Sequence, residues 1–212
     1  MSRKGKIYGL VGVIGSGKSY RAKMLENNSR KFETPIIIGD FSEGIRQTIV
    51  KILSGSDRKI DVNSTAYSSW KKMPQVLNLP IHPLGDIPYV IQTNGREILQ
   101  RTGECLKTLA GEDVWARWTA NYVIQQWVKM SEEDKNSCDI VFGSLRFECE
   151  VKALFKVAEI TGKEIQIIFC DFYSNSYELN DHISEKFAQY FLSLGCKDGD
   201  DITQLVKEKV NE

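Results

Sequence analysis

The sequence predicts an α/β protein of three layers, in which a parallel sheet is covered by helices on both faces. Short apolar runs alternate with segments of helical periodicity along most of the 212 residues. The first apolar run ends in a glycine-rich turn that leads directly into a helix. Hydrophobic residues make up 42% of the chain, which is enough to fill the core of one such domain.

Four apolar runs are expected to form the strands of this sheet, at residues 6–13, 35–38, 139–145 and 164–170. Helices are expected at residues 19–26, 42–53, 94–101, 113–130, 148–160, 181–194 and 202–210, with Gly103 ending the third helix and the polar run 131–137 forming a loop. Because parallel strands bring their carboxyl ends to one edge of a sheet, we expect ligands to bind at that edge.

The turn after the first strand carries a phosphate-binding pattern. Residues 12–19, GVIGSGKS, fit G-x-x-x-x-G-K-[ST], whose glycines allow successive backbone N–H groups to turn toward a phosphate. The positive end of the following helix lies beneath them. Lys18 is expected to reach the β- and γ-phosphates of ATP, and Ser19 is expected to ligate Mg²⁺. The expected nucleotide-binding set is Gly12, Gly15, Ser16, Gly17, Lys18, Ser19 and Tyr20.

The composition argues against several kinds of partner. The chain has 28 basic and 28 acidic side chains, so it lacks the basic surplus of a nucleic-acid-binding protein. Its apolar runs are shorter than a membrane span, and its N-terminus does not read as a signal peptide. The five cysteines form no C-x-x-C pair, which indicates reduced thiols in a cytoplasmic protein. The oligomeric state stays open, with a homodimer among the alternatives.

Three classes of phosphate-loop protein compete. The sequence lacks the N-K-x-D or T-K-x-D segment that a GTPase uses to read guanine. A remodelling ATPase has an acid at the end of an apolar strand, whereas residues 139–145 end without one and Asp171 is the available substitute. A kinase of small substrates needs a second phosphate grip and a cover that excludes water. A short domain with a long central insertion fits the kinase best.

Three further segments resemble the bacteriophage deoxynucleoside monophosphate kinases. Residues 95–115 resemble that family's R-x-x-L-Q-x-x-G and D-x-W segment, residues 141–150 its D-x-R-F-x-x-E segment, and residues 181–185 its H-x-S-E segment. The matched positions are Arg96, Leu99, Gln100, Gly103, Asp113, Trp115, Arg146, Phe147, Glu150, His182, Ser184 and Glu185. The resemblance implies an adenylate-kinase-like fold and ATP-dependent phosphorylation of a deoxynucleoside monophosphate in the cytoplasm of a bacterial host.

The acceptor nucleotide is expected to meet a second set of residues, namely Asp40, Arg96, Gln100, Arg146 and Glu150. Arginine forms bidentate contacts with phosphate, and Arg146 directly follows a buried strand, so Arg146 joins Lys18 as an expected catalytic residue. Asp40 fits a sugar hydroxyl, a magnesium-bound water or a helix N-cap equally well. Gln100 fits a base or a backbone group, and Glu150 fits a role in orienting Arg146.

The expected domain is a single unit of residues 1–212, with an insertion at about 41–110 over the acceptor site and a lid-like segment at about 172–185. Residues 56–93 hold four of the five prolines and show little periodicity. An unstructured stretch of that length is unusual in a compact domain, so we expect short helices there.

Two departures from the family's pattern bear on activity. Ser144 stands where the family has an acid, and no arginine follows Arg146. A late arginine can contribute a factor of about 10³–10⁵ to the rate of related reactions, and Lys186 is the one basic residue near that place. The alternatives are therefore a weak or inactive kinase-derived nucleotide-binding protein, or a kinase of the same fold with another phosphorylated acceptor.

Overall fold

The structure, a computed structural model, describes residues 3–54, 74–79, 89–172 and 183–211. These residues divide into two compact units. The first unit comprises Met1–Phe41 and Ala116–Glu212, and the second comprises Ser42–Trp115. Within the described residues, no helix combines the length and the apolar character that crossing a bilayer requires.

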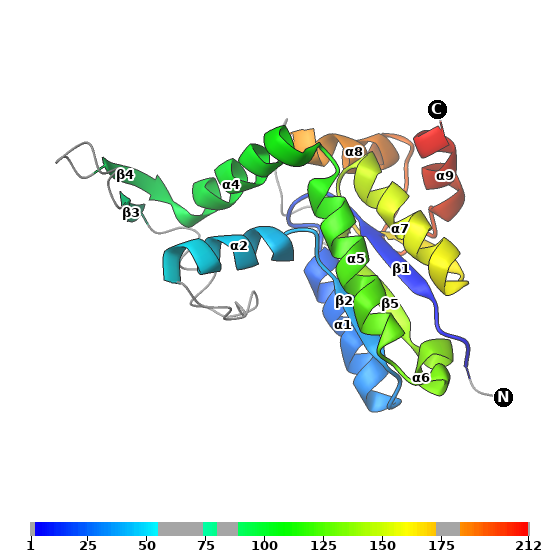
Figure 1. The fold of residues 1–212 in the computed structure, drawn as a ribbon. Coiled ribbons are helices and arrows are strands. Elements are labelled where there is room, and N and C mark those ends of the chain that lie inside the picture. The colour runs from blue at the N-terminus through cyan, green and yellow to red at the C-terminus, as the bar shows by residue number, and fades with distance from the viewer. Residues whose placement is uncertain (1–2, 55–73, 80–88, 173–182, 212) are drawn as a thin grey trace. The chain divides into compact units, whose positions relative to one another are not determined.

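The first unit contains a parallel sheet of four strands in the order β2-β5-β1-β6 (Figure 1). The strands are β1 (Ile7–Val11), β2 (Ile36–Gly39), β5 (Asp139–Leu145) and β6 (Ile165–Phe169). The central strand β1 pairs with both β5 and β6, and β2 pairs with the outer side of β5. The parallel sheet expected from the sequence is confirmed.

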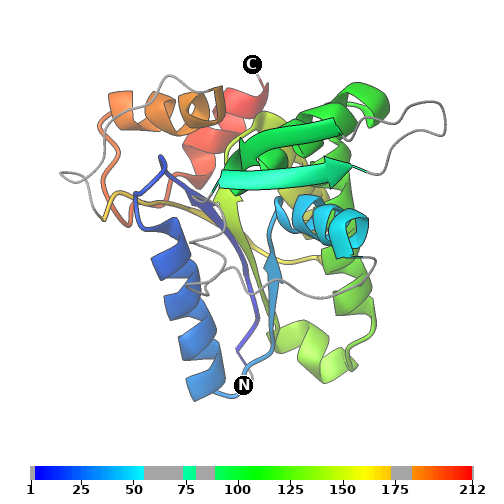
Figure 2. The same cartoon turned by 90° about the vertical axis from the view of Figure 1, so that its left-hand side faces the viewer.

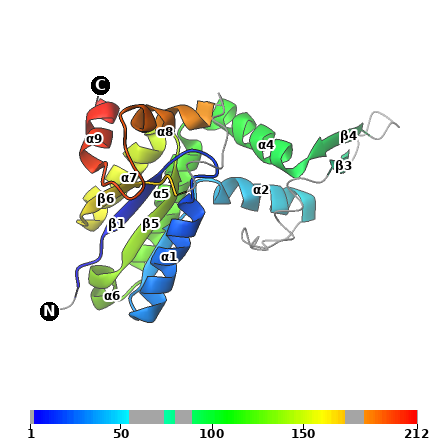
Figure 3. The same ribbon diagram turned by 180° about the vertical axis from the view of Figure 1, so that it is seen from behind.

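Helices cover both faces of this sheet, which makes three layers (Figures 2 and 3). The helix α1 (Lys18–Lys31) packs on one face, where Tyr8 and Leu10 of β1 point. Ile7 and Val11 point to the opposite face, because successive strand residues alternate. That face is covered by α5 (Val114–Val128), α7 (Glu148–Thr161), α8 (Ile183–Ser193) and α9 (Thr203–Asn211). The expectation of a three-layer α/β fold is therefore confirmed.

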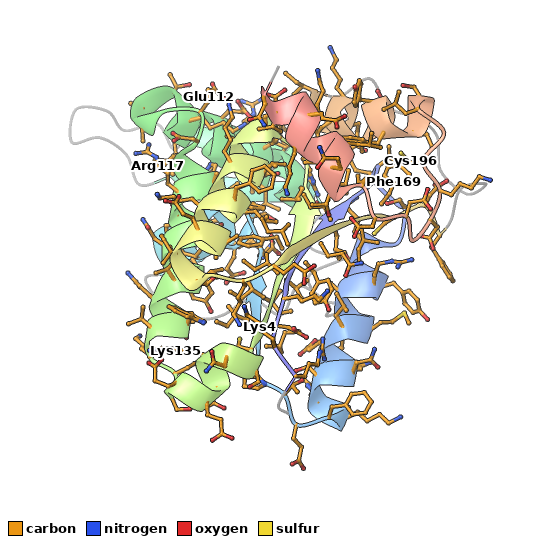
Figure 4. All side chains as sticks on the ribbon, turned by 90° about the vertical axis from the view of Figure 1, so that its right-hand side faces the viewer. Lys4, Glu112, Arg117, Lys135, Phe169 and Cys196 are labelled. Atoms are coloured by element: carbon orange, nitrogen blue, oxygen red, sulfur yellow. The ribbon has the colours of Figure 1, made fainter. Side chains whose placement is uncertain are left out.

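The carboxyl ends of the four strands share one edge of the sheet because all four run in the same direction. The phosphate-binding loop follows β1, Asp40 follows β2, Arg146 follows β5 and Asp171 lies just beyond β6. Phe169 marks this end of β6 in Figure 4, whereas Lys4 lies toward the opposite end of the sheet. The fold thus brings residues that are distant in sequence to one edge.

The second unit contains α2 (Glu43–Ser54), α4 (Gly95–Ala110) and an antiparallel pair of strands, β3 (Pro74–Leu79) and β4 (Tyr89–Asn94). The expectation of short helices across residues 56–93 is wrong at these two strands. Val76, Leu77 and the run Tyr89–Ile91 favour extended backbone, and their cross-strand pairing lies beyond the reach of a local pattern. The rest of that stretch, residues 55–73 and 80–88, lies outside the described residues.

Two segments of the first unit form helix where the sequence predicted none. The first helix continues to Lys31 instead of ending near residue 26, and its polar Ser29 is buried because the hydroxyl donates to the Thr34 carbonyl. A short helix, α6 (Glu132–Ser137), replaces the expected loop. Its start is fixed by Ser131, whose hydroxyl accepts the Asp134 N–H at 3.1 Å.

Gly103 lies inside α4, although it was expected to end that helix. A Cβ atom at this position would lie 3.1 Å from Ile45 Cδ1 of α2, and Trp115 Nε1 donates to the Gly103 carbonyl at 3.1 Å. The glycine therefore permits close packing within the second unit, which is a use that helix-stop rules do not distinguish from termination.

Candidate phosphate-binding site

The loop after β1 adopts a conformation that requires its three glycines, for two different reasons. Gly15 and Gly17 have φ angles of 86° and 93°, in the left-handed region that side chains disfavour. Gly12 is required by space, because a Cβ atom there would collide with the Cys170 carbonyl and with Ser16 Oγ. The glycine spacing of the motif is thus explained by the backbone of this loop.

The loop delivers the chain directly into the N-terminus of α1. Gly17 is the N-cap residue, and in the part of the chain that the structure describes no side chain caps this helix. Ser19 and Tyr20 in its first turn are exposed. The first N–H groups of a helix have no partner within the helix, and the helix dipole places partial positive charge there. This end of α1 is therefore suited to bind a phosphate group.

Lys18 is held against the loop by two backbone carbonyls. Its ammonium group donates to the Gly12 carbonyl at 2.6 Å and to the Val13 carbonyl at 2.7 Å, and the residue is only 8% exposed. Burial, and then the positive charge of Arg146, lower the pKa of Lys18 from 10.5 to about 8, against an opposing effect of Glu185. The lysine is therefore a buried cation whose charge an arriving phosphate would stabilise.

Ser16 supplies an unsatisfied polar atom at the same loop. The residue is fully buried, and its hydroxyl has no hydrogen-bond partner among the described residues. Its backbone is fixed on both sides, since its N–H donates to Val13 and its carbonyl accepts the N–H of Phe172 at 3.0 Å. Buried hydroxyl groups are normally hydrogen-bonded, so this orphan atom marks a place where a ligand or a water belongs.

Arg146 acts on the phosphate loop from the end of the neighbouring strand β5. Its charge is the second cause of the lowered pKa of Lys18, so the two cations lie within electrostatic range. The Nε atom of Arg146 donates to Ser144 Oγ at 3.0 Å. Both expected catalytic residues, Lys18 and Arg146, therefore belong to the first unit, and their catalytic roles remain predictions.

Glu150 holds the backbone beside Arg146. Its Oε2 atom accepts the N–H of Arg146 at 2.6 Å and the N–H of Phe147 at 3.2 Å, and it forms a capping box at the start of α7. The side chain is 7% exposed. This arrangement positions Arg146 through the main chain, and the expected contact of Glu150 with a substrate stays a prediction.

Ser19 is the residue that the motif would offer to Mg²⁺. Ser19 is exposed beside the loop, as the motif requires, while the described residues contain no group of three His, Cys, Asp or Glu side chains that could hold a metal ion. Asp40 is partly exposed after β2, and its carbonyl accepts the Thr119 hydroxyl at 3.4 Å. Mg²⁺ is commonly held by one or two protein groups together with waters and substrate phosphates, so this set fits a nucleotide-borne ion.

The remaining expected acceptor residues belong to the second unit. Gln100 is exposed on α4, and the side chain of Arg96 lies outside the described residues, as does His182. Arg101, five residues after Arg96, pairs with Glu97 at 2.6 Å on the helix surface. The acceptor roles of Arg96 and Gln100 therefore remain predictions.

One residue of the site was given no role by the sequence argument. Glu185 of α8 is 2% exposed, and its Oε2 atom accepts the backbone N–H of Ile14 in the phosphate loop at 2.5 Å. The contact joins residues 171 positions apart. The H-x-S-E match included Glu185 but gave it no role, and an acid in the first turn of a helix is common.

No protein-family model and no curated protein matches the chain. Among solved structures, the chain is similar to the Cys556Ala mutant of the Mycobacterium tuberculosis APS kinase CysC. The sequence identity is 15% and the TM-score is 0.32, and the alignment covers 91% of this chain and 98% of that one. The same kinase in complex with AMPPNP and APS gives 14% identity, a TM-score of 0.31, and coverage of 90% and 97%. At such TM-scores the fold assignment rests on the sheet order and the loop.

Proposed function

We propose that this protein is an ATP-dependent kinase that transfers a phosphoryl group to a deoxynucleoside monophosphate. The observation that carries the proposal is the pairing of the phosphate-binding loop with Arg146 at the carboxyl edge of the sheet. The loop offers backbone N–H groups, a helix N-terminus and the buried Lys18 cation. Arg146 adds a second positive charge within electrostatic range of Lys18.

Two cations suit the charge that develops during phosphoryl transfer. An oxygen of the acceptor phosphate forms a bond to the γ-phosphorus of ATP while the bond from that phosphorus to the β–γ bridging oxygen breaks, and ADP leaves. Negative charge spreads over the equatorial oxygens of the transferred group, so catalysis depends on positioning and on positive charge. Lys18 and Arg146 can supply that charge.

The nucleotide base has an apolar surface available beside the loop. The rings of Tyr20 and Phe172 lie 5.4 Å apart between centroids, and the two residues are 50% and 54% exposed. Aromatic rings that face solvent next to a phosphate site can stack on a base. Tyr20 directly follows Ser19, which would hold the Mg²⁺ that neutralises the phosphates during transfer.

The choice of a deoxynucleoside monophosphate as acceptor rests on the sequence resemblance. The matching segments supply Arg96, Gln100, Arg146 and Glu150, while Asp40 is added by its place at the end of β2. An arginine grip on the acceptor phosphate and polar groups for sugar and base are the chemistry that such a substrate needs.

Release of ADP from Mg-ATP, measured against a panel of deoxy- and ribonucleoside monophosphates, tests this proposal. We expect release that depends on one or a few deoxynucleoside monophosphates and that is lost in Lys18→Ala. Stimulation by a different phosphorylated acceptor would replace the substrate while keeping the kinase. An absence of release with every acceptor would overturn the proposal.

A nucleotide-binding protein with little turnover is the second candidate, and one observation favours it. The acid expected at the end of β5 is Ser144, whose hydroxyl is engaged by Arg146 Nε. That strand end therefore offers no carboxylate to a metal. This candidate predicts ATP binding by calorimetry without transfer to any acceptor.

A further inference from the structure

The carboxylate of Glu185 contacts the first residues of the phosphate-binding loop. Ile14 lies two residues after Gly12, and its backbone N–H donates to Glu185 Oε2 at 2.5 Å. Ile14 is 45% exposed, whereas Glu185, which accepts its N–H, is 2% exposed. The Ile14 N–H thus donates to a buried carboxylate that belongs to α8 of the same unit.

The charge of Glu185 acts on the same lysine that would receive the terminal phosphates. Glu185 raises the pKa of Lys18 against the larger effect of burial, so the carboxylate and the ammonium group are electrostatically coupled. In phosphate-binding loops the backbone N–H groups cradle the α- and β-phosphates, and the lysine reaches the β- and γ-phosphates. Glu185 is therefore coupled to the group that would reach the terminal phosphate, and it also holds a loop N–H group.

A carboxylate and a terminal phosphate can bind to the same groups of this loop. Both are oxyanions, both accept from a backbone N–H group, and both are stabilised by a nearby ammonium group. Two anions cannot share one N–H group and one cation without repulsion in a site that excludes water. One of them has to leave when the other arrives.

We propose that Glu185 occupies the terminal-phosphate position of the loop, so that the third phosphate of a nucleoside triphosphate competes with an internal carboxylate. This inference rests on the proposed nucleotide site and goes beyond it, because it names the residue that sets the preference between triphosphate and diphosphate. A diphosphate fills the part of the loop nearer α1 and leaves the Ile14–Glu185 contact in place. A triphosphate breaks that contact.

Binding of AMPPNP and ADP to the wild type and to Glu185→Gln, measured by calorimetry without an acceptor, tests the inference. The amide oxygen of glutamine still accepts the Ile14 N–H, so the variant removes charge while keeping the hydrogen bond. We expect AMPPNP to bind about tenfold more tightly to the variant, or about 1.4 kcal/mol, with ADP changed less than about threefold. Glu164→Gln, an exposed acid just before β6, is the matched control and should change neither affinity.

Two results would overturn the inference while leaving the nucleotide site intact. An equal gain for ADP and AMPPNP would show that Glu185 does not distinguish the third phosphate. A loss of AMPPNP affinity confined to Mg²⁺-containing buffer would show that the carboxylate serves the metal. If the wild type bound neither nucleotide, and Lys18→Ala were no different, both the nucleotide site and the inference would fail together.

Amide hydrogen exchange in the wild type gives a second measurement that needs no variant. In the free protein, the hydrogen bond to Glu185 should protect the Ile14 amide from exchange. ADP should leave both the exchange rate and the chemical shift of that amide nearly unchanged. AMPPNP should shift the Ile14 amide resonance, since the acceptor of its hydrogen bond changes from carboxylate to phosphate. A shift of the same size with ADP would contradict the inference even if Glu185→Gln failed to fold.

Discussion

Glu150 fixes the main chain of Arg146 through a hydrogen bond of 2.6 Å from the Arg146 N–H to its Oε2 atom. The same oxygen accepts the N–H of Phe147, so one buried carboxylate closes the turn between β5 and α7. Replacing Glu150 by alanine removes this cap, and we expect the free energy of unfolding to fall by about 1 kcal/mol. Denaturant unfolding measures the change.

The effect of Glu150 on catalysis can be separated from its effect on stability. Glu150→Gln keeps an oxygen that accepts both N–H groups, so we expect it to retain most of the stability and of the turnover. Glu148→Ala, an exposed acid two residues earlier, is the control for loss of a carboxylate in this turn. A stable Glu150→Gln protein without activity would show that Glu150 contacts the substrate directly.

The lowered pKa of Lys18 predicts how anion binding depends on pH. The charged form binds phosphate, and Lys18 loses its proton as the pH rises through about 8. We therefore expect ADP affinity to be nearly constant from pH 6.5 to 7.5 and to fall by up to about tenfold per pH unit above that pKa. Lys18→Arg should bind with less pH dependence in this range, because arginine keeps its charge. A flat wild-type profile up to pH 10 would contradict this prediction.

Removal of Arg146 should move that pH profile. The positive charge of Arg146 is the second cause of the lowered pKa of Lys18, so Arg146→Ala should raise the pKa and shift the loss of ADP affinity to higher pH. The same variant should lose turnover by a factor of about 10³ or more, because the positive charge that stabilises the transferred phosphoryl group is removed. Loss of activity with an unchanged pH profile would mean that Arg146 acts away from Lys18.

Gly12, directly after β1, and Gly143, inside the neighbouring strand β5, form a matched pair of glycines. A Cβ atom at Gly12 would collide with the Cys170 carbonyl, whereas one at Gly143 would meet nothing within 4 Å. We expect Gly12→Ala to lower the free energy of unfolding by roughly 1–3 kcal/mol and to abolish ADP binding. Gly143→Ala should stay within about 0.5 kcal/mol of the wild type. Equal effects of the two variants would contradict the close approach described for the loop.

Phe172 offers a test of where the nucleotide base lies. If the base stacks beside Tyr20, Phe172→Ala should weaken AMPPNP binding by about 1–3 kcal/mol while leaving tripolyphosphate binding unchanged. Calorimetry with both ligands measures the difference. An equal loss for both ligands would indicate damage to the loop, since the Phe172 N–H donates to the Ser16 carbonyl.

Much of the first unit could be predicted because its signals are local. The apolar run Asp139–Leu145 gave β5 with the observed bounds, and the motif at residues 12–19 placed the loop between a strand and a helix. The parallel direction of the strands follows from their alternation with helices. These features depend on spacing along the chain, which the sequence displays directly.

The misses share a physical cause, which is contact between residues far apart in sequence. β3 and β4 pair across residues that showed no periodicity, and Gly103 serves packing against Ile45 instead of ending a helix. Glu185 reaches Ile14 across 171 positions. No local pattern reports such contacts. The H-x-S-E match included Glu185, but only the three-dimensional structure shows that it touches the phosphate loop.

Transfer of the γ-phosphoryl group itself tests the central claim most directly. ATP carrying a radioactive γ-phosphate is mixed with the protein, Mg²⁺ and the monophosphate panel, and the products are separated after a single turnover. We expect the label on a deoxynucleoside diphosphate in the wild type and on no product in Lys18→Ala. Label found only in inorganic phosphate, or retained entirely in ATP with every acceptor, would contradict the assignment of this protein as a nucleotide kinase.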